Sequence, residues 1–169
     1  RRLVKVRAMR SGSAAFVALV LLISVVGADV VSYAERLLLR DEAAEMVAHA
    51  YDAYMAHGYP WDELKPLSCE GRRWDRRERG TLDDNLGGYA LTLVDSLSTL
   101  ALMRDGPRLR RAVQLVARDV HFDRDVIVSV FESTIRVLGG LLSAHELSLQ
   151  IPGLLGASYG GELLHLAVD

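Results

Sequence analysis

The segment 131–145 constrains the fold of this chain more than any other part. It reads Phe-Glu-Ser-Thr-Ile-Arg-Val-Leu-Gly-Gly-Leu-Leu-Ser-Ala-His. Apolar residues recur at steps of four, three and four positions, namely Phe131, Ile135, Leu138 and Leu142. That spacing is the period of an amphipathic α-helix, so the segment is predicted to be helical with one apolar face.

The opposite stripe of this helix carries polar and very small residues: Glu132, Arg136, Gly139, Gly140 and Ser143. Each glycine inside a helix costs about 1 kcal/mol relative to alanine. Adjacent glycines therefore indicate close approach of a ligand or of another backbone at that stripe. An acid beside such a stripe is predicted to lie at the mouth of a cleft, where it can act in catalysis.

A structural interpretation of Glu132 competes with the catalytic one. Ser129 and Glu132 have the spacing of a capping box, in which each side chain accepts from the backbone N–H of the other residue. Glu132 and Arg136 also have the spacing of an ordinary ion pair on a helix surface. Spacing alone leaves both interpretations open.

The rest of the chain reads as a succession of helices joined by loops. Helices are expected over about 33–57, 89–103 and 107–120, with extended chain at 126–128 leading into the segment 131–145. A long loop with glycine and proline breakers follows the first of these helices. The first helix is expected to bury Leu37, Leu38, Met46, Val47, Ala50, Tyr51 and Tyr54, and the third Leu109, Val113, Leu115 and Val116.

Several of these blocks, in this order, resemble one enzyme family. The segment 131–145 resembles the characteristic helix of the class I α-1,2-mannosidases, glycoside hydrolase family 47. The blocks at 51–69, 91–100 and 120–125 resemble the family's preceding elements, so the resemblance covers roughly 41–169. Leu-Ser-Cys ending at Cys69, and histidine at the end of Leu-Ser-Ala-His, are similar to the branch of ER degradation-enhancing α-mannosidase-like proteins.

The resemblance implies an all-α fold. The family folds into an (α/α) barrel, a toroid of about seven helix pairs, and this chain would supply about the first two pairs as a partial barrel. We therefore expect an N-terminal fragment with a signal peptide or signal anchor at 1–32 and mannosidase-like domain residues at 33–169. The basic start and the apolar run 14–28, which ends in small residues, have the pattern of a targeting segment.

The resemblance also implies the chemistry. Members remove α-1,2-linked mannose from N-glycans with inversion, which needs two carboxyl groups on opposite faces of the sugar. Glu132 matches the family's general acid and Arg136 its substrate-binding arginine. The base and the Ca²⁺ ligands belong to later helices, so no metal ligand is assigned here and the chain alone is expected to be inactive.

Two function classes remain open. The first is a glycosidase that trims high-mannose N-glycans of misfolded glycoproteins for ER-associated degradation. The alternative is a non-catalytic factor that binds glycans or clients in ER quality control. Asp95 stands at the first acid of the family's Asp-Ala-Leu-Asp, but Ser98 replaces the second acid, which indicates divergence. The acid pair Asp62 and Glu63 reads either as a helix or turn cap or, by resemblance, as a substrate-side feature.

Location and partners follow from the same resemblance. The chain is expected in the ER lumen, soluble or anchored by its N-terminal segment, with ER chaperones or oxidoreductases as possible partners. Cys69 is the only cysteine, and in an oxidising compartment its disulfide partner is expected outside this chain. The net charge of -2 gives no reason to expect nucleic acid as a partner.

Overall fold

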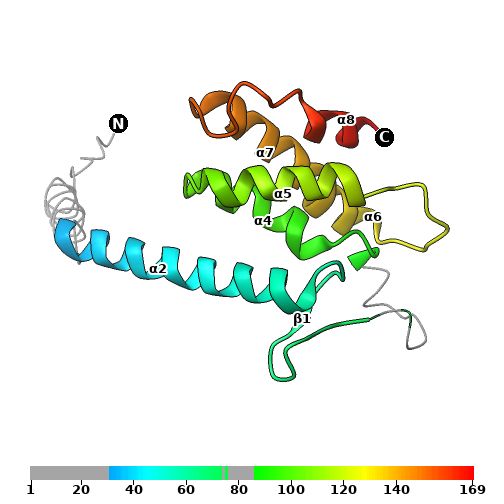
Figure 1. Ribbon diagram of the computed structural model, residues 1–169, viewed down its shortest axis with the longest axis horizontal. Helices are drawn as coiled ribbons and strands as arrows, with labels where there is room; N and C mark the ends of the chain where they lie inside the picture. The colour runs from blue at the N-terminus through cyan, green and yellow to red at the C-terminus, as the bar shows by residue number, and fades with distance from the viewer. Residues whose placement is uncertain (1–30, 74, 76–85) are drawn as a thin grey trace, which may run out of the picture. The chain divides into compact units, whose positions relative to one another are not determined.

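The computed structural model describes residues 31–73, 75 and 86–169 (Figure 1). It divides into two compact units, residues 1–43 and 44–169. The expected targeting segment at 1–32 lies almost entirely outside the described residues. Among the residues that are described, no helix is both long enough and apolar enough to cross a membrane.

The first described helix, α2 (Tyr33–Ala53), begins in the first unit and ends in the second. Ser32 caps it, because the Ser32 hydroxyl accepts from the Glu35 backbone N–H at 3.2 Å. In the second unit Tyr51 and the following Tyr54 are buried, as predicted. Leu38 and Met46 were expected to be buried, but they are 65% and 72% exposed, and Ala50 is exposed too. That expectation was wrong because helical spacing marks a side chain that can be buried, while burial requires a second element to cover it.

A small hairpin follows α2, where the sequence indicated only a loop. A π-helical turn, η1 (Tyr54–Gly58), ends the helix, and strands β1 (Leu64–Lys65) and β2 (Glu70–Gly71) then pair antiparallel. Each strand has two residues, too few to show the alternating pattern by which strands are recognised in a sequence.

Helices α4 (Leu91–Leu102) and α5 (Gly106–Asp119) form the centre of the second unit. Both lie where the sequence predicts helices. Asp105 caps α5 by accepting from the Arg108 backbone N–H at 3.1 Å, and Pro107 occupies the first turn. All four side chains predicted to be buried on this helix are buried: Leu109, Val113, Leu115 and Val116.

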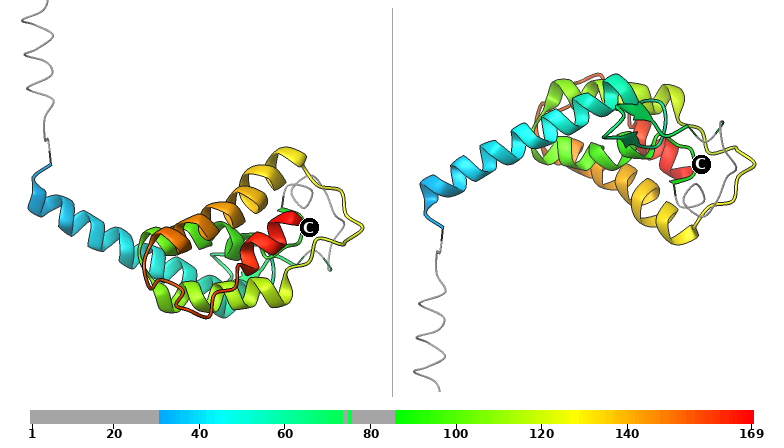
Figure 2. Two further views of the ribbon diagram at one scale, coloured as in Figure 1. Left: turned by 90° about the horizontal axis from the view of Figure 1, so that it is seen from above. Right: turned by 90° about the horizontal axis from the view of Figure 1, so that it is seen from below.

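The remaining chain forms a long helix and a short one. Residues 130–150 are continuous helix, made of α6 (Val130–Glu132), the π-helical η3 (Ser133–Leu138) and α7 (Gly139–Gln150). A segment without helix or strand, 120–129, leads into it, so 126–128 form no strand. Helix α8 (Glu162–Val168) packs against both α7 and α5, and α4 packs against α7 (Figure 2).

The apolar core of the second unit lies between these helices. Its fully buried members come from α4, α5, α7 and α8: Leu93, Val94, Leu97, Leu109, Val116, Leu141 and Leu163. In the part of the chain that the structure describes, the fold is all-α apart from the hairpin, which confirms the predicted fold class. The packing of this core holds α4 against the helix that carries Glu132.

Candidate active site

The helix that carries Glu132 begins at Ser129. The Ser129 hydroxyl accepts from the Glu132 backbone N–H at 3.4 Å, and the Ser129 carbonyl accepts from Ser133 N–H at 2.9 Å. This is one half of the predicted capping box. The Glu132 carboxylate does not complete the other half, because its Oε2 accepts from Arg136 Nε at 2.5 Å.

The π-helical segment changes which side chains of this helix face the core. Val137, Leu141 and Ala144 are buried against the rest of the unit. The apolar face predicted by regular α-helical spacing is instead exposed, at 69% for Phe131 and 51% for Ile135. A π-turn adds a residue to the local repeat, so a face counted at 3.6 residues per turn is rotated away from its expected direction.

Of the two adjacent glycines, Gly140 faces the backbone of another helix, whereas Gly139 meets only the Thr134 carbonyl oxygen of its own helix. A Cβ added to Gly140 would lie 3.4 Å from the Val94 carbonyl oxygen and 3.5 Å from Val94 Cγ1. Val94 is fully buried on α4. The small residue therefore allows α4 to lie close to the 130–150 helix, which brings the next residue of α4, Asp95, to Arg136.

Arg136 connects two carboxylates from different helices. Its Nε donates to Glu132 Oε2, four residues earlier on the same helix, and its Nη1 donates to Asp95 Oδ2 on α4 at 2.8 Å. These two hydrogen bonds raise the pKa of Arg136, with Glu132 contributing more than Asp95. The Glu132 side chain is 24% exposed, less than Arg136 at 45%. The predicted pair of Glu132 and Arg136 is therefore present, and Asp95 joins it.

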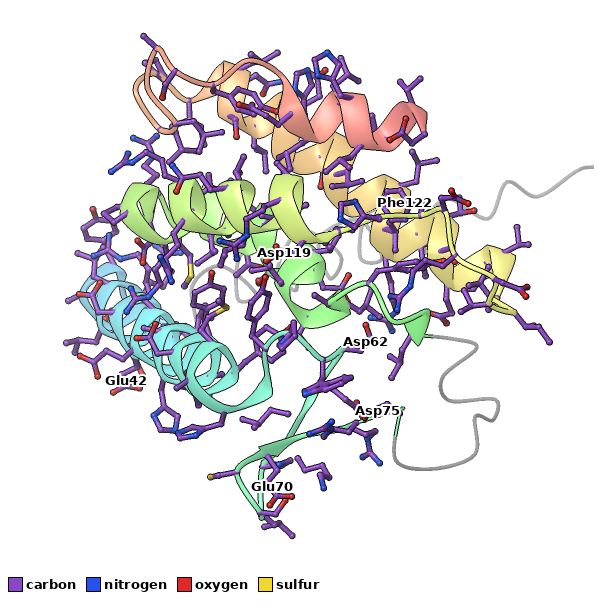
Figure 3. The ribbon with its side chains drawn as sticks, turned by 45° about the vertical axis from the view of Figure 1, so that its right-hand side comes forward. Glu42, Asp62, Glu70, Asp75, Asp119 and Phe122 are labelled. Carbon is purple, nitrogen blue, oxygen red and sulfur yellow. The ribbon has the colours of Figure 1, made fainter. Side chains whose placement is uncertain are left out.

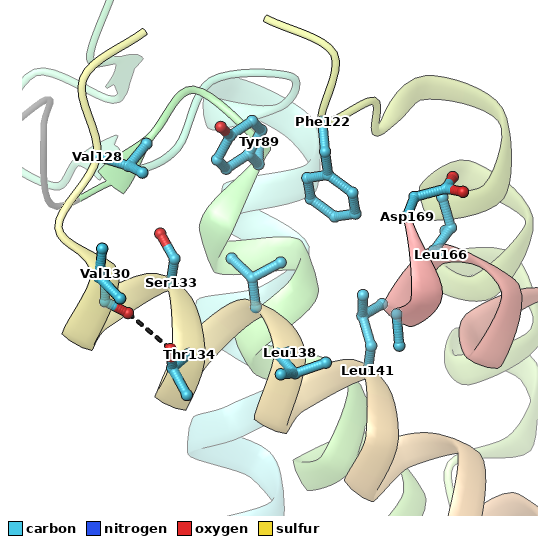
Figure 4. A pocket seen from close by; sticks show the side chains of 12 residues that line it. Tyr89, Phe122, Val128, Val130, Ser133, Thr134, Leu138, Leu141, Leu166 and Asp169 are labelled. Atoms are coloured by element: carbon cyan, nitrogen blue, oxygen red, sulfur yellow. Dashed lines mark hydrogen bonds between the residues drawn. The ribbon is translucent and has the colours of Figure 1, made fainter.

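An apolar cavity of about 330 Å³ lies beside the same helix (Figure 4). Tyr89 and Phe122 form one side of it, and Thr134, Leu138 and other residues of the 130–150 helix form the other. Neither Glu132 nor Arg136 is among the residues that line this cavity or two others in the described part of the chain. The cleft expected beside Glu132 is therefore not one of these three cavities.

Asp62 is a buried carboxylate that holds the start of α4 (Figure 3). It is 5% exposed, and its two carboxylate oxygens accept from the backbone N–H groups of Gly88 at 2.8 Å and Leu91 at 3.0 Å. The Asp62 carbonyl accepts from the Thr92 hydroxyl at 2.6 Å. Burial raises the pKa of Asp62, although the backbone N–H groups of Leu91, Gly88 and Tyr89 oppose that shift.

The cap of α4 has to come from a distant residue. Ala90 precedes the helix with a left-handed φ of 53° and has no side-chain group that can cap it. Of the two open interpretations of Asp62, the structure therefore shows the cap. The sequence signal that pointed to Asp62 was an acid between chain breakers, and it did not reveal which helix would be capped.

Other residues singled out from the sequence lie apart from Glu132. Glu63 forms an ion pair with Arg72, and Cys69 is exposed in the turn of the hairpin. Ser98 is half-buried on α4, three residues after Asp95. His145 is buried, and its Nδ1 is 2.8 Å from the Tyr159 hydroxyl, so this branch-specific histidine is a packed residue of α7.

Metal ligands were not assigned from the sequence. Within 31–73, 75 and 86–169, no group of three histidine, cysteine, aspartate or glutamate side chains is placed to hold a metal ion. The described residues therefore do not fit the calcium site that the sequence resemblance implies for the family.

The sequence matches the model of glycosyl hydrolase family 47 over residues 46–169, and the chain belongs to this family. It is 47% identical over 144 residues to ER degradation-enhancing alpha-mannosidase-like protein 3 of Homo sapiens, covering 83% of this chain and 16% of that protein. It is 49% identical over 130 residues to alpha-mannosidase I MNS4 of Arabidopsis thaliana, covering 76% of this chain and 19% of that protein.

A fungal relative gives a similar result. ER degradation-enhancing alpha-mannosidase-like protein 1 of Saccharomyces cerevisiae is 43% identical over 136 residues, covering 76% of this chain and 17% of that protein. The resemblance to the family and to its ER degradation-enhancing branch is thus confirmed. The chain spans less than a fifth of the length of each of these three relatives.

Proposed function

We propose that this chain is the N-terminal part of an α-1,2-mannosidase that trims high-mannose N-glycans of misfolded glycoproteins in the ER lumen. Membership of glycosyl hydrolase family 47 and the names of its relatives support a mannosidase-like role in ER degradation. The observation that carries the proposal for the site is the position of Glu132. Its side chain is 24% exposed, its Oε2 accepts from Arg136, and it does not cap its own helix.

The proposed reaction is hydrolysis of a terminal mannose with inversion. One carboxylic acid protonates the departing glycosidic oxygen while a second carboxylate activates a water on the opposite face of the sugar. Glu132 is the proton donor in this scheme. Arg136 presents a planar set of N–H donors that can bind sugar hydroxyl groups as well as carboxylates.

The rest of the reaction needs residues beyond those assigned here. The base has no candidate among the described residues that face Glu132. Family membership implies a general dependence on calcium, whose ligands we place in later helices, as the resemblance implies.

A non-catalytic factor that binds glycans or clients is the second candidate. The observation that favours it is Ser98, which stands where the family's second acid is expected on α4. The exposed Cys69 is compatible with either function, since an oxidoreductase or a cysteine elsewhere in the full-length protein can pair with it.

The test is mannose release by the full-length protein from a glycan with nine mannose residues, measured for the wild type and for Glu132→Gln. Glutamine keeps the shape of the side chain and cannot donate the proton, so the rate is expected to fall by a factor of roughly 10² or more. Equal, measurable rates would remove Glu132 from the mechanism. Glycan binding without any release by the wild type would establish the second candidate.

A further inference from the structure

Arg136 binds two carboxylates, Asp95 and Glu132, and the surrounding structure holds Asp95 more firmly than Glu132. Asp95 lies on α4 between Val94, which is fully buried, and the buried residues of the next turn, Leu97 among them. The Asp62 carboxylate also accepts from the backbone N–H of Leu91, the first residue of this helix, and from that of Gly88 before it. Asp95 is therefore presented by a helix that the core keeps in place.

Glu132 lies in a less constrained position. It belongs to the first turn of its helix, and its neighbours Val130 and Phe131 are 78% and 69% exposed. First turns of helices are held by fewer backbone hydrogen bonds than their interiors. Of the two carboxylates that contact Arg136, Glu132 is thus the one whose side chain can change its contacts at lower cost.

As a proton donor Glu132 must be protonated, but its contact with Arg136 favours the ionised form. The firmer position of Asp95 offers a way to meet both requirements. A general acid must carry its proton when the glycosidic bond breaks. An arginine that donates to a carboxylate favours the ionised form of that carboxylate and so opposes the protonated state. The enzyme needs Arg136 near the sugar, but it also needs the charge of Arg136 to be neutralised by a group other than the acid.

We propose that Asp95 is a positioning residue that keeps Arg136 in place when Glu132 is protonated. Its carboxylate, 2.8 Å from Arg136 Nη1, binds the guanidinium while Glu132 turns its proton toward the glycosidic oxygen. The inference rests on the proposed function, because it assigns Glu132 the role of proton donor.

Few other charged groups face this site from the elements around it. Asp95 is the only ionisable side chain of α4, and Arg136 is the only cation of the 130–138 segment. The preceding extended chain carries Asp123, Arg124 and Asp125, of which Arg124 donates to the Gly88 carbonyl. Helix α7 carries His145, bonded to Tyr159, and Glu146. Among the described residues, Arg136 is the cation hydrogen-bonded to Glu132, and Asp95 is the second acid on that arginine.

The experiment is the pH profile of kcat for mannose release by the full-length protein carrying Asp95→Asn. Without the Asp95 charge, Arg136 stabilises ionised Glu132, so the alkaline limb of the profile should move to lower pH by about one unit. At a pH on that limb, kcat should fall about tenfold, while KM changes by less than about threefold. A uniform loss of activity with an unshifted limb would overturn the proposal.

The matched control is Asp52→Asn. It removes a carboxylate from Arg108 in the same compact unit, and its profile should not shift. Asp95→Asn combined with Arg136→Ala should behave as Arg136→Ala alone, because Asp95 acts through that arginine. An additive effect of the two substitutions would contradict the inference.

Two outcomes separate this inference from the proposed function. Full activity of Glu132→Gln would refute the proposed function. Dependence on Glu132 together with an unshifted Asp95→Asn profile would refute only the role of Asp95. If Asp95→Asn does not fold, Asp95→Ser is measured in its place, and failure of both to fold would show that Asp95 is a structural residue.

Discussion

Two arginines of the second unit are each bound by two carboxylates, yet the two arrangements differ in a way that matters for function. Arg108 donates from Nε and Nη2 to both oxygens of Asp52, at 2.9 and 2.6 Å, and from Nη1 to Asp105 at 2.6 Å. Arg136 donates from Nε to Glu132 and from Nη1 to Asp95. Among the contacts of the described residues, Arg108 therefore forms a bidentate pair with Asp52, whereas Arg136 makes one hydrogen bond to each of its two acids.

The comparison indicates that the contacts of Arg108 are fixed, whereas those of Arg136 can be exchanged. A bidentate pair fixes both distance and plane, so Arg108 joins the end of α2 to the capped start of α5. Each acid of Arg136 is held by one N–H, so either contact can be replaced without loss of the other. The first arrangement suits a structural role, and the second suits a site where one acid changes its protonation state.

The largest expected effect comes from removing each arginine in turn. In the full-length protein, Arg136→Ala should lower kcat/KM for mannose release by a factor of roughly 10², because the acid and the sugar lose their orientation. Arg108→Ala should leave the activity of folded protein within about twofold. Similar losses of kcat/KM in both variants would contradict the distinction between a site arginine and a structural one.

Carboxylates provide the second contrast, between a buried cap and an exposed ion pair. Asp62→Asn should lower the free energy of unfolding by about 1–3 kcal/mol, because one buried N–H at the start of α4 loses its acceptor. Asp52→Asn should cost at most about 1 kcal/mol, since the Asp52 side chain is 56% exposed. Urea denaturation of both variants measures the difference, and an equal cost would mean that the cap contributes no more than the ion pair.

The same two aspartates should give pH dependences of opposite sign. Burial raises the pKa of Asp62 above 3.8, so its protonation stabilises the fold at pH values below 3.8, and this stabilisation is lost as pH rises through the folded-state pKa. The hydrogen bond from Arg108 lowers the pKa of Asp52, so its contribution is present above 3.8 and lost as pH falls.

Unfolding free energies measured from pH 3 to pH 7 test this contrast. The difference between the wild type and Asp62→Asn should change in favour of the variant as pH rises, and the difference for Asp52→Asn should change in the other direction. A common direction for both variants would contradict the assigned causes.

The smallest expected effect is at Gly140, where α4 approaches the 130–150 helix. An added Cβ would be in ordinary contact with Val94, 3.4 Å from its carbonyl oxygen, so Gly140→Ala should be neutral or stabilise the fold by up to about 1 kcal/mol. Gly140→Leu should separate the helices and break the contact between Arg136 and Asp95. Thermal unfolding compares the two variants, and a large cost for alanine would show that the helices tolerate no added atom.

The sequence predicted the helices of the second unit well, because their signals are local. Asp105 and Pro107 mark the start of α5, and the spacing of Leu109, Val113 and Val116 identifies its buried face. The pair of Glu132 and Arg136 was also visible, because residues four apart share a helix face. The π-turn within 133–138 could not be predicted, because no residue type in the segment signals it, although it shifts the apolar face.

What the sequence by itself determined is therefore the family, the helices and the acid with its arginine on one helix. Only the tertiary structure showed that Asp62 caps α4 from 29 residues before Leu91, and that Asp95 reaches Arg136 across 41 residues. The physical reason is range. Helical periodicity and the capping signals of a sequence act within a few residues. A cap from a distant residue, or a contact between helices, depends on how the backbones pack, here through Gly140 against Val94.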